Sequence, residues 1–418
     1  MRFLCSTFGS AGDVFPMLGL ALALRQRGHD VSFATNAHYG GVVESSGLPF
    51  HALGTEEDFQ RCVDNPDLWH PLRAFGHVIR SLQPVLKAQY ELHVTSAHPD
   101  LIAITNCFGF GAFNARETIG LPVITMHCQP AVLWSDIDPP ALPGLVGPQW
   151  LQRLGYRLGV RWMLHPTVAR FVNPWRAELG LGPIPPVTSW WNSPDGVLAM
   201  FPDWYAPAQP DWPPHVMQTD FPLWNHRSDR PLDPEVEDFL TAGKPPIVFT
   251  PGSANIHGSD FFRSAVDACR LLGRRAVLLS EFPDQIPPLS GTDAAHFAYV
   301  PLDRILPRSA AFVHHGGIGS TSQALLAGIP QVIMPLAHDQ FDNLQRITRR
   351  SLGAGLPVRR FRPRPLANTL DQLLNSTDVH SACQAAAARL APRDGLTRSA
   401  VAIEERGTEL LASRRDRT

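Results

Sequence analysis

Apolar runs alternate with short glycine-containing loops at the start of the chain. The run over residues 2–7 predicts a buried strand, and a loop of small residues, 8–12, follows it. Residues 17–27 predict a helix that stops at Gly28, because glycine readily adopts the left-handed conformation that ends a helix. The apolar run 31–35 predicts a second strand. Strand, glycine loop, helix and strand in this order open a doubly wound α/β domain.

The same order of elements starts again in the second half. Strands are predicted at 101–105, 122–126 and 197–200 in the first half, and at 246–250, 276–280, 310–314 and 331–334 in the second. Residues 201–234 hold eight prolines and are typical of a linker. The sequence thus predicts two doubly wound, Rossmann-like domains, 1–205 and 235–395, joined by a proline-rich linker at 206–234. If the two domains face each other across a cleft, the carboxyl ends of both sheets meet there, where ligands of open α/β sheets bind.

Composition narrows the class of partner. The 418 residues are 44% apolar and 18% charged, and 36 Lys and Arg against 38 Asp and Glu give a net charge of −2. This balance argues against nucleic acid as a partner. The six cysteines form no CxxC pair, which is typical of reduced thiols in the cytoplasm rather than of a zinc site or disulfide framework. We find neither a signal peptide nor an apolar run of about 18 residues that could span a membrane.

A glycine-rich loop follows the strand predicted at 310–314. It reads Val313-His-His-Gly-Gly-Ile-Gly-Ser-Thr321 and leads into a helix. Glycines at a strand-to-helix junction let backbone N–H groups approach an anion, and the helix N-terminus favours negative charge. The loop matches neither GxGxxG nor the Walker motif, and the chain lacks the G-x-S-x-G elbow that an esterase HGGG loop requires. It indicates a diphosphate cradle, with a tight turn that binds nothing as the alternative.

A second polar pair follows the next strand. Asp339 and Gln340 come shortly after the strand that ends at Met334, at the carboxyl edge of the predicted sheet. A carboxylate and a carboxamide side by side can each bind adjacent sugar hydroxyls. The alternative is that Asp339 caps a helix over 340–350.

In these motifs the chain resembles the nucleotide-sugar-dependent glycosyltransferases of the two-Rossmann GT-B fold. The resemblance is to the branch with natural-product, sterol and glycopeptide glycosyltransferases, and within it to the bacterial rhamnosyltransferases of rhamnolipid synthesis. It is carried by GSAGDVFPMLGLALALRQRGHDV (9–31), HCQPAVLWSDIDPP (127–140), PGSA (251–254), YVPLDRILPRSAAFVHHGGIGSTSQALLAGIP (299–330) and PLAHDQFDN (335–343).

The resemblance implies roles in donor binding. Tyr299 would stack on the base and the Val300 backbone would pair with its edge, while Asp339 and Gln340 would hold the sugar. The residues implied around the two phosphates are Ser253, His315, Gly316, Gly317, Gly319, Ser320 and Thr321. Many UDP-sugar enzymes carry a Glu on the ribose where this chain has Gln323. Because a thymidine donor has no 2′-hydroxyl, a dTDP-sugar is at least as well supported as a UDP-sugar.

The resemblance also implies the reacting groups. Asp13 would be the general base for the acceptor hydroxyl, and His315 would stabilise the leaving diphosphate. Ser10, Gly12, His127 and Trp134 would lie on the acceptor side. The alternative is that Asp13 only caps its helix, with His38, His127 or His338 as other bases. The implied reaction is an in-line displacement with inversion that needs no metal or other cofactor. Asp136-Ile-Asp138 fits the D-x-D metal pattern, but two prolines follow it and it is interpreted as a turn.

The acceptor is expected to be hydrophobic. Tryptophans 134, 150, 162, 190, 191 and 204 gather in the first half, where they would suit an apolar acceptor surface; the alternative is that they are core residues, as tryptophan more often is. Arg153, Arg157 and Arg161 form a basic stripe beside an apolar helix face. The stripe could meet anionic lipid headgroups, in peripheral contact with the inner face of a membrane, or an acceptor carboxylate; a solvated face is the alternative.

The predicted function is the transfer of a hexose or deoxyhexose, with dTDP-rhamnose favoured as donor, to a hydroxyl of a lipid such as a hydroxy fatty acid. Sterol, macrolide or polyketide acceptors are the alternatives within the class. A non-catalytic nucleotide-sugar-binding protein is the alternative outside it. The last helix, 396–418, resembles the closing helix of the family, which packs back on the first domain.

Overall fold

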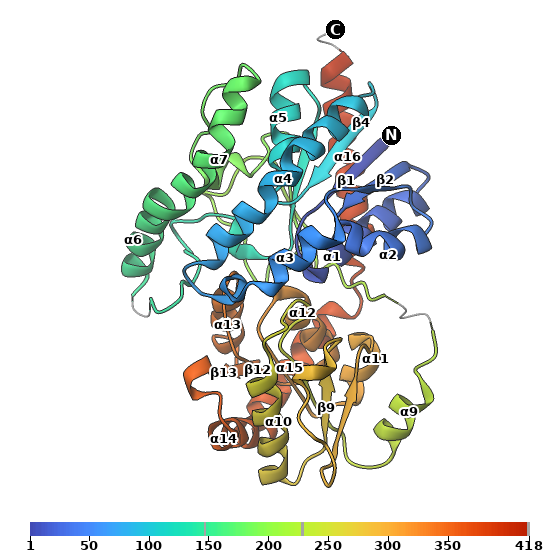
Figure 1. The fold of residues 1–418 in the computed structure, drawn as a ribbon, viewed down its shortest axis with the longest axis vertical. Helices are drawn as coiled ribbons and strands as arrows, with labels where there is room; N and C mark the ends of the chain where they lie inside the picture. Colours follow the sequence, from blue (N-terminus) through green and yellow to red (C-terminus); the bar gives the residue numbers. More distant parts are fainter. Residues whose placement is uncertain (146–147, 227–229, 416–418) are drawn as a thin grey trace. The chain divides into compact units, whose positions relative to one another are not determined.

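Each half of the chain forms one parallel β-sheet, because crossover segments, most of them helical, return the chain to the same end of the sheet between successive strands. The structure is a computed structural model, which describes residues 1–145, 148–226 and 230–415 (Figure 1). Contacts divide it into two units. Unit 1 comprises Met1–Leu68, Leu72–Pro222 and Asp394–Thr418, and unit 2 comprises Trp69–Pro71 and Leu223–Arg393. The predicted α/β class with two doubly wound domains is confirmed.

The sheet of unit 1 has the strand order β3-β2-β1-β4-β5-β6-β7. The strands are β1 Arg2–Ser6, β2 Asp30–Thr35, β3 Phe50–Ala52, β4 Leu101–Thr105, β5 Val123–His127, β6 Val197–Ala199 and β7 Val216–Gln218. In the central register, Arg2 pairs with Asp30 on one side and with Leu101 on the other. All residues of β4 and β5 are buried, as expected for a parallel sheet that helices cover on both faces.

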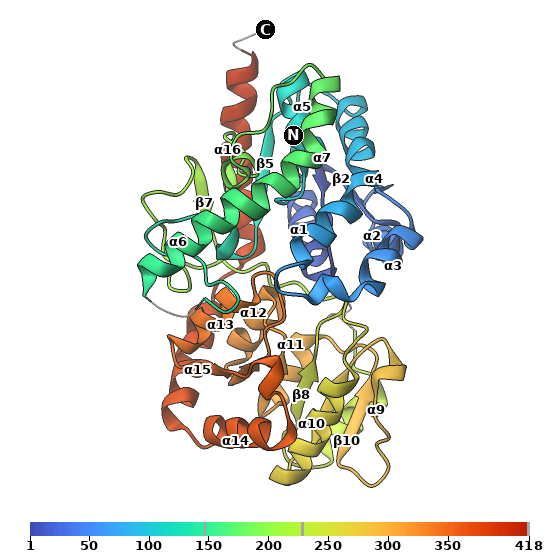
Figure 2. The ribbon, with the colours of Figure 1, turned by 60° about the vertical axis from the view of Figure 1, so that its left-hand side comes forward.

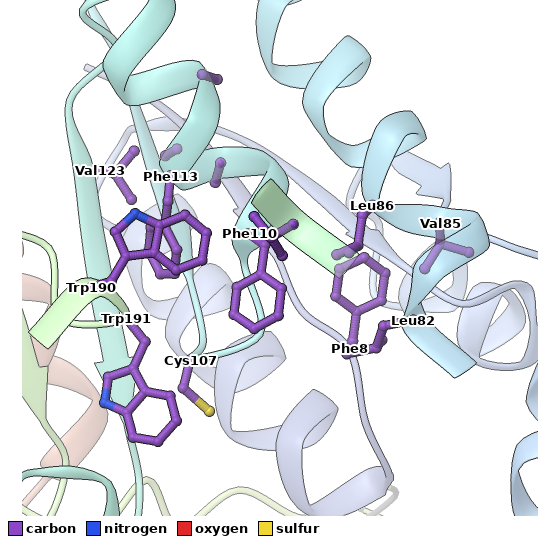
Figure 3. Close-up of a cluster of buried hydrophobic side chains, with 14 of the residues drawn as sticks. Phe8, Leu82, Val85, Leu86, Cys107, Phe110, Phe113, Val123, Trp190 and Trp191 are labelled. Carbon is purple, nitrogen blue, oxygen red and sulfur yellow. The ribbon is translucent and has the colours of Figure 1, made fainter. Parts of the chain in front are cut away.

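The helices of unit 1 bury one large apolar cluster against this sheet. They are α1 Ala11–Gln26, α2 Gly40–Ser45, α3 Glu56–Asp64, α4 Ala74–Thr95, α5 Phe110–Ile119, α6 Gln149–Gly159, α7 His165–Glu178, α8 Val187–Trp190 and α16 Gly395–Arg415, with a π-helix, Val160–Leu164, between α6 and α7. Figure 3 shows the cluster, in which Trp190 packs with Phe110 and Phe113 and to which Trp191 also belongs. These two tryptophans are core residues, so they do not line an apolar acceptor surface as we expected.

The sheet of unit 2 repeats the arrangement with the order β10-β9-β8-β11-β12-β13. Its strands are β8 Ile247–Thr250, β9 Ala276–Leu279, β10 Ala294–Phe297, β11 Ala311–His314, β12 Gln331–Ile333 and β13 Gly353–Gly355. Its helices are α9 Pro234–Thr241, α10 Ser259–Leu272, α11 Leu302–Ile305, α12 Ile318–Ala327, α13 Gln340–Thr348, α14 Pro363–Leu374 and α15 Thr377–Leu390.

The proline-rich segment differs from its prediction as a linker over 206–234. Strand β7 lies inside it and pairs with β6, and the change of unit falls between Pro222 and Leu223. The prolines on both sides of β7 made this segment look like a linker in the sequence. An edge strand tolerates nearby prolines because only one of its sides forms hydrogen bonds with a neighbouring strand. Residues 227–229 of the predicted linker lie outside the described residues.

Helix α16 packs on unit 1 (Figure 2). Near its start, the Ser399 hydroxyl lies 2.7 Å from that of Thr219, and Arg398 pairs with Asp220. Farther along, Glu404 accepts hydrogen bonds from Arg27 at 2.6 Å and from His29 at 2.7 Å. Residues 416–418 of the predicted closing helix lie outside the described residues.

The strand order places two loops of unit 2 together. In each sheet the order reverses beside its first strand, between β1 and β4 and between β8 and β11. Ligands of doubly wound sheets bind at the carboxyl ends of the strands at this switch point. In unit 2 the two loops there are Pro251–Asn255 after β8 and His315–Gly317 after β11. In unit 1 the loop after β1 leads directly to Asp13.

Candidate active site

The glycine-rich loop of unit 2 forms a tight turn into helix α12. Gly316 has a φ of +98°, and a Cβ there would lie 2.6 Å from the Ile333 side chain. Helix α12 then begins at Ile318, with Gly317, which has no side chain to cap the helix, at the N-cap position. The amides of a first helical turn have no intrahelical acceptor. A Cβ on Gly319 would meet nothing within 4 Å, so that part of the turn is open to a ligand.

His315 is held against two glycines of this site. A Cβ on Gly252 would lie 2.9 Å from the His315 ring, and one on Gly317 would lie 2.7 Å from its Nε2. Its Nδ1 is buried and has no hydrogen-bond partner among the described residues. Burial, with added repulsion from His314 and His338, lowers the pKa of His315 to about 3. The ring is therefore neutral at physiological pH, and its unpartnered nitrogen is a polar group that a ligand can satisfy.

His314 fixes the loop from the buried side. Its Nδ1 accepts a hydrogen bond from the Gly316 N–H at 3.0 Å, so its proton is on Nε2, which donates to Gln331 Oε1 at 3.0 Å. The ring stacks on Phe312 with centroids 4.6 Å apart, and burial lowers its pKa to about 4. We assigned His314 no role from the sequence. The available signal was the pair of adjacent histidines at a strand end, since consecutive strand residues point to opposite sides.

The first turns of α12 hold further polar atoms that lack partners. The Thr321 Oγ1 and the Gln323 Oε1 are both buried and have no hydrogen-bond partner in the described part of the chain. The Ser320 side chain is half-buried. Leaving a buried polar atom unpaired costs about 1–3 kcal/mol, so several such atoms near one helix start are a feature that a bound ligand explains.

Asp339 lies beside the start of α12 and does not cap its own helix. It occupies the N-cap position of α13 without a side-chain capping bond, so the capping alternative is wrong. Instead, Asn343 Nδ2 donates to Asp339 Oδ2 at 2.7 Å and to the Gly316 carbonyl at 2.9 Å. Burial raises the pKa of Asp339 to about 6, although hydrogen bonds from Asn343 and from the Asp339 and Ile318 amides act in the opposite direction. Asn343, to which we assigned no role, thus ties the carboxylate to the glycine loop.

Gln340 is largely used by its own loop. Its Oε1 accepts hydrogen bonds from the Leu336 N–H at 2.6 Å and the Ala337 N–H at 3.1 Å. The carboxamide oxygen is therefore engaged, and a sugar hydroxyl would have to meet its NH₂ group. Sequence alone gives no signal for this, because the role depends on the side-chain conformation.

Of the residues expected at the nucleotide base and at the loop after β8, Tyr299 and Ser253 are exposed to solvent. Tyr299 is 36% exposed, and its hydroxyl donates to the His226 carbonyl at 2.8 Å. Val300, which follows it, is buried. Ser253 is exposed in a turn that the Asn255 N–H closes on the Gly252 carbonyl at 3.2 Å.

Asp13 is fixed at the start of α1 in unit 1. Its Oδ2 accepts the Ser10 N–H at 3.0 Å, and Ser10 Oγ accepts the Gly12 N–H at 3.3 Å, which together form a capping box. Gly9 has a φ of +134°, and a Cβ there would lie 2.5 Å from Asp13 Cγ. Asn106, at the end of β4, donates to the Phe8 carbonyl at 2.8 Å and holds the same loop. Asp13 therefore does cap its helix, and its carboxylate has a defined position.

The other acceptor-side residues are tied into the fold. His127 is buried, its Nε2 donates to Asn192 Oδ1 at 2.8 Å, and burial lowers its pKa to about 4. This burial argues against His127 as an alternative base. The centre of the Trp134 ring lies 4.0 Å from the centre of the Tyr156 ring. His38 pairs with Glu56 at 2.8 Å.

The D-x-D segment forms a turn. The Ser135 Oγ accepts the Ile137 and Asp138 N–H groups at 3.0 and 3.1 Å, and Asp136 forms an ion pair with Arg157. Among the described residues, no group of three His, Cys, Asp or Glu side chains could hold a metal ion. In the same part of the chain, no helix is long and apolar enough to cross a membrane.

Two doubly wound units, one with a glycine-rich helix start beside polar atoms that lack partners among the described residues, define a two-domain α/β protein. The family model described as the glycosyltransferase family 28 N-terminal domain matches residues 3–107. The model described as the erythromycin biosynthesis protein CIII-like C-terminal domain matches residues 285–397.

Relatives match over most of the chain. It is 31% identical to the glycosyltransferase GtfC of Amycolatopsis orientalis over 375 residues, which cover 86% of this chain and 88% of the relative. It is 26% identical to the O-mycaminosyltylonolide 6-deoxyallosyltransferase of Streptomyces fradiae, with 97% of each chain covered. The solved structure of the spinosyn rhamnosyltransferase SpnG complexed with thymidine diphosphate shares the fold with a TM-score of 0.65 at 16% identity, covering 97% of this chain and 99% of that one. The chain belongs to the GT-B glycosyltransferases and is a glycosyltransferase enzyme.

Proposed function

We propose that this enzyme transfers a hexose or deoxyhexose from a dTDP-sugar to a hydroxyl of a hydrophobic acceptor, with inversion at the anomeric carbon. The observation that carries the proposal is the glycine-rich start of α12, where the buried Nδ1 of His315 and Oγ1 of Thr321 have no partner in the described residues. A diphosphate bound there would receive hydrogen bonds from fixed amides and gain from the helix dipole.

Two observations favour thymidine over uridine in the donor. Gln323 offers a neutral carboxamide, a weaker acceptor for ribose hydroxyls than a carboxylate, and its Oε1 is buried and unpartnered in the described residues. Three solved structures that share the fold, those of SsfS6, VinC and SpnG, are complexes with thymidine diphosphate. UDP-sugars are the alternative donors, and dTDP-rhamnose is the first donor to test.

The proposed reaction is one displacement. Asp13 takes the proton of the acceptor hydroxyl while that oxygen forms a bond to the anomeric carbon, and the bond from this carbon to the diphosphate oxygen breaks on the opposite face. The diphosphate leaves with the electron pair of that bond. His315, neutral at physiological pH, donates a hydrogen bond to it, and Asp339 together with the NH₂ group of Gln340 holds sugar hydroxyls. Preorganised donors at the leaving group lower the barrier because they need no reorganisation during the reaction.

The acceptor is proposed to be a hydroxyl-bearing hydrophobic compound. A hydroxy fatty acid lipid and a polyketide or macrolide aglycone both fit this class. The relative named O-mycaminosyltylonolide 6-deoxyallosyltransferase, of Streptomyces fradiae, which is 26% identical over 437 residues, supports the second type. A sterol is a third option within the same chemistry.

A donor and acceptor screen tests the proposal. The purified enzyme is incubated with dTDP-rhamnose, dTDP-glucose or UDP-glucose and with 3-hydroxyacyl lipids, sterols or macrolide aglycones, and diphosphate release and product mass are followed. We expect turnover with a dTDP-sugar, no loss of rate in excess EDTA, and no turnover by Asp13→Asn. Turnover restricted to UDP-sugars would refute the donor assignment, and a strict requirement for a divalent cation would refute the metal-free mechanism.

A further inference from the structure

Large apolar side chains of unit 1 are exposed together on one helix. Of the ten exposed large hydrophobic residues in the described chain, six lie between positions 137 and 163: Ile137, Trp150, Leu154, Leu158, Trp162 and Met163. The other four are scattered over both units. Single exposed apolar residues are normal, but a contiguous group marks an interaction site.

Four of these residues form a single stripe. Trp150, Leu154, Leu158 and Trp162 recur every four residues along α6 and the π-helix that follows, so they share one side of the helix. They are 64%, 47%, 47% and 69% exposed. We call these four residues the α6 face. Figure 1 shows α6 at the edge of unit 1.

The opposite side of α6 is the one that packs against unit 1. Gln152 and Tyr156 are buried there. The helix thus turns two tryptophans outward while it buries a glutamine and a tyrosine. This is the reverse of what folding alone favours, since burying a large apolar side chain contributes about 1.5–3 kcal/mol to folding. The α6 face is therefore built to be covered by something else.

The charge around the α6 face indicates what covers it. Residues 139–177 contain five arginines and no Asp or Glu, in a chain whose net charge is −2, although one of the five, Arg176, is buried in an ion pair with Glu117. Arg161 is exposed and its guanidinium lies 5.5 Å from the centre of the Trp162 ring. Arg157 is also exposed and binds Asp136. Tryptophan and leucine flanked by arginine are typical of helices that lie in the interface of an anionic bilayer.

A second copy of this chain is a poorer fit for the α6 face. In a two-fold dimer the same patch meets itself, so the arginines of one copy would approach those of the other. An anionic bilayer fits both the apolar side chains of the α6 face and the arginines around it. The indole and leucine side chains would enter the boundary of the acyl region, while the guanidinium groups would bind headgroup phosphates.

We propose that the α6 face docks the enzyme on an anionic lipid bilayer. The proposal does not depend on which sugar or acceptor the enzyme uses. The contact is peripheral, with the helix lying in the plane of the interface. Such docking would hold the enzyme where hydrophobic acceptors partition.

Vesicle flotation tests the proposal with the full-length protein. Wild type is mixed with vesicles of phosphatidylcholine alone or with 30 mol% phosphatidylglycerol (about the anionic fraction that gives a strong negative surface). The apolar variant is Trp150→Ser/Trp162→Ser, and the matched control is Leu271→Ser, which removes an exposed leucine of α10 that is 57% exposed. Circular dichroism and the melting temperature verify that each variant is folded.

We expect wild type and Leu271→Ser to float with the anionic vesicles, and the double tryptophan variant to bind them about tenfold or more weakly. Arg161→Gln should weaken binding about fivefold, and 0.5 M salt should weaken binding of wild type. No binding by wild type, or equal binding by the double variant, would overturn the proposal. Sedimentation showing a dimer that only the tryptophan variant dissociates, without vesicle binding, would assign the face to self-association and would also overturn it.

Discussion

Replacing His315 by alanine tests the diphosphate cradle at the residue where the structure makes the strongest demand. The buried Nδ1 has no partner among the described residues, and the ring is wedged between Gly252 and Gly317. If the imidazole donates one hydrogen bond to a charged phosphate oxygen, its loss costs about 1.5–3 kcal/mol. This corresponds to about 10- to 150-fold in dissociation constant.

The assay is calorimetric titration of dTDP into wild type and His315→Ala at pH 7.5. Because burial lowers the pKa of His315 to about 3, the ring is neutral at this pH and the lost contact is a hydrogen bond rather than an ion pair. The ratio of the two affinities should therefore change little between 50 and 500 mM salt, where an exposed ion pair would be screened.

His380→Ala is the matched control, because His380 is exposed on α15 and its ring bonds to the Leu374 carbonyl at 3.0 Å, away from the glycine loop. It should bind dTDP as wild type does. An affinity of His315→Ala within twofold of wild type, with the variant folded, would refute the role of His315 in binding the diphosphate.

Other predictions follow from the capping box and from the buried histidines. Gly9→Ala should reduce turnover at least about 100-fold and leave dTDP affinity unchanged. The new Cβ would lie 2.5 Å from Asp13 Cγ and would therefore displace the Asp13 carboxylate. Rapid turnover by this variant would show that the carboxylate is not the base. Stability should fall as the pH drops from 7 to 5, because three buried histidines have pKa values near 4 against 6.5 in the unfolded chain, which therefore binds more protons; they are His93, His127 and His314. Each lowers the free energy of unfolding by about 2 kcal/mol over this range. Asp339, with its pKa raised to about 6, changes stability in the opposite direction by about 1 kcal/mol. A melting temperature that is flat between pH 7 and 5 would contradict these shifts.

The strands and loops that carry the switch points could be predicted from sequence. Buried parallel strands are nearly continuous apolar runs, and β4, for example, occupies the predicted residues 101–105. The loops after β8 and β11 follow from those strand ends. By contrast, β13 consists of Gly-Ala-Gly and has no apolar pattern, so only its pairing with β12 defines it as a strand.

The position of the candidate site in the sequence could be predicted, but the hydrogen-bond partners of its side chains could not. The glycines predicted the turn before α12. The sequence did not show that His314 holds the loop while His315 keeps an unpartnered nitrogen in the described residues, because this depends on which ring enters the core. Likewise, the oxygen of Gln340 bonds to two backbone amides of its own loop, which only the folded conformation shows. Sequence pattern reports which residue types reach the sheet edge, and packing decides which of their atoms remain for a ligand.

A crystal structure of the complex with dTDP tests the central claim most directly. We expect the two phosphates at the start of α12, accepting hydrogen bonds from the amides of Gly319 and Ser320 and from the His315 ring. Phosphates bound away from this helix start, for instance against the Ser10–Asp13 turn of unit 1, would contradict the account.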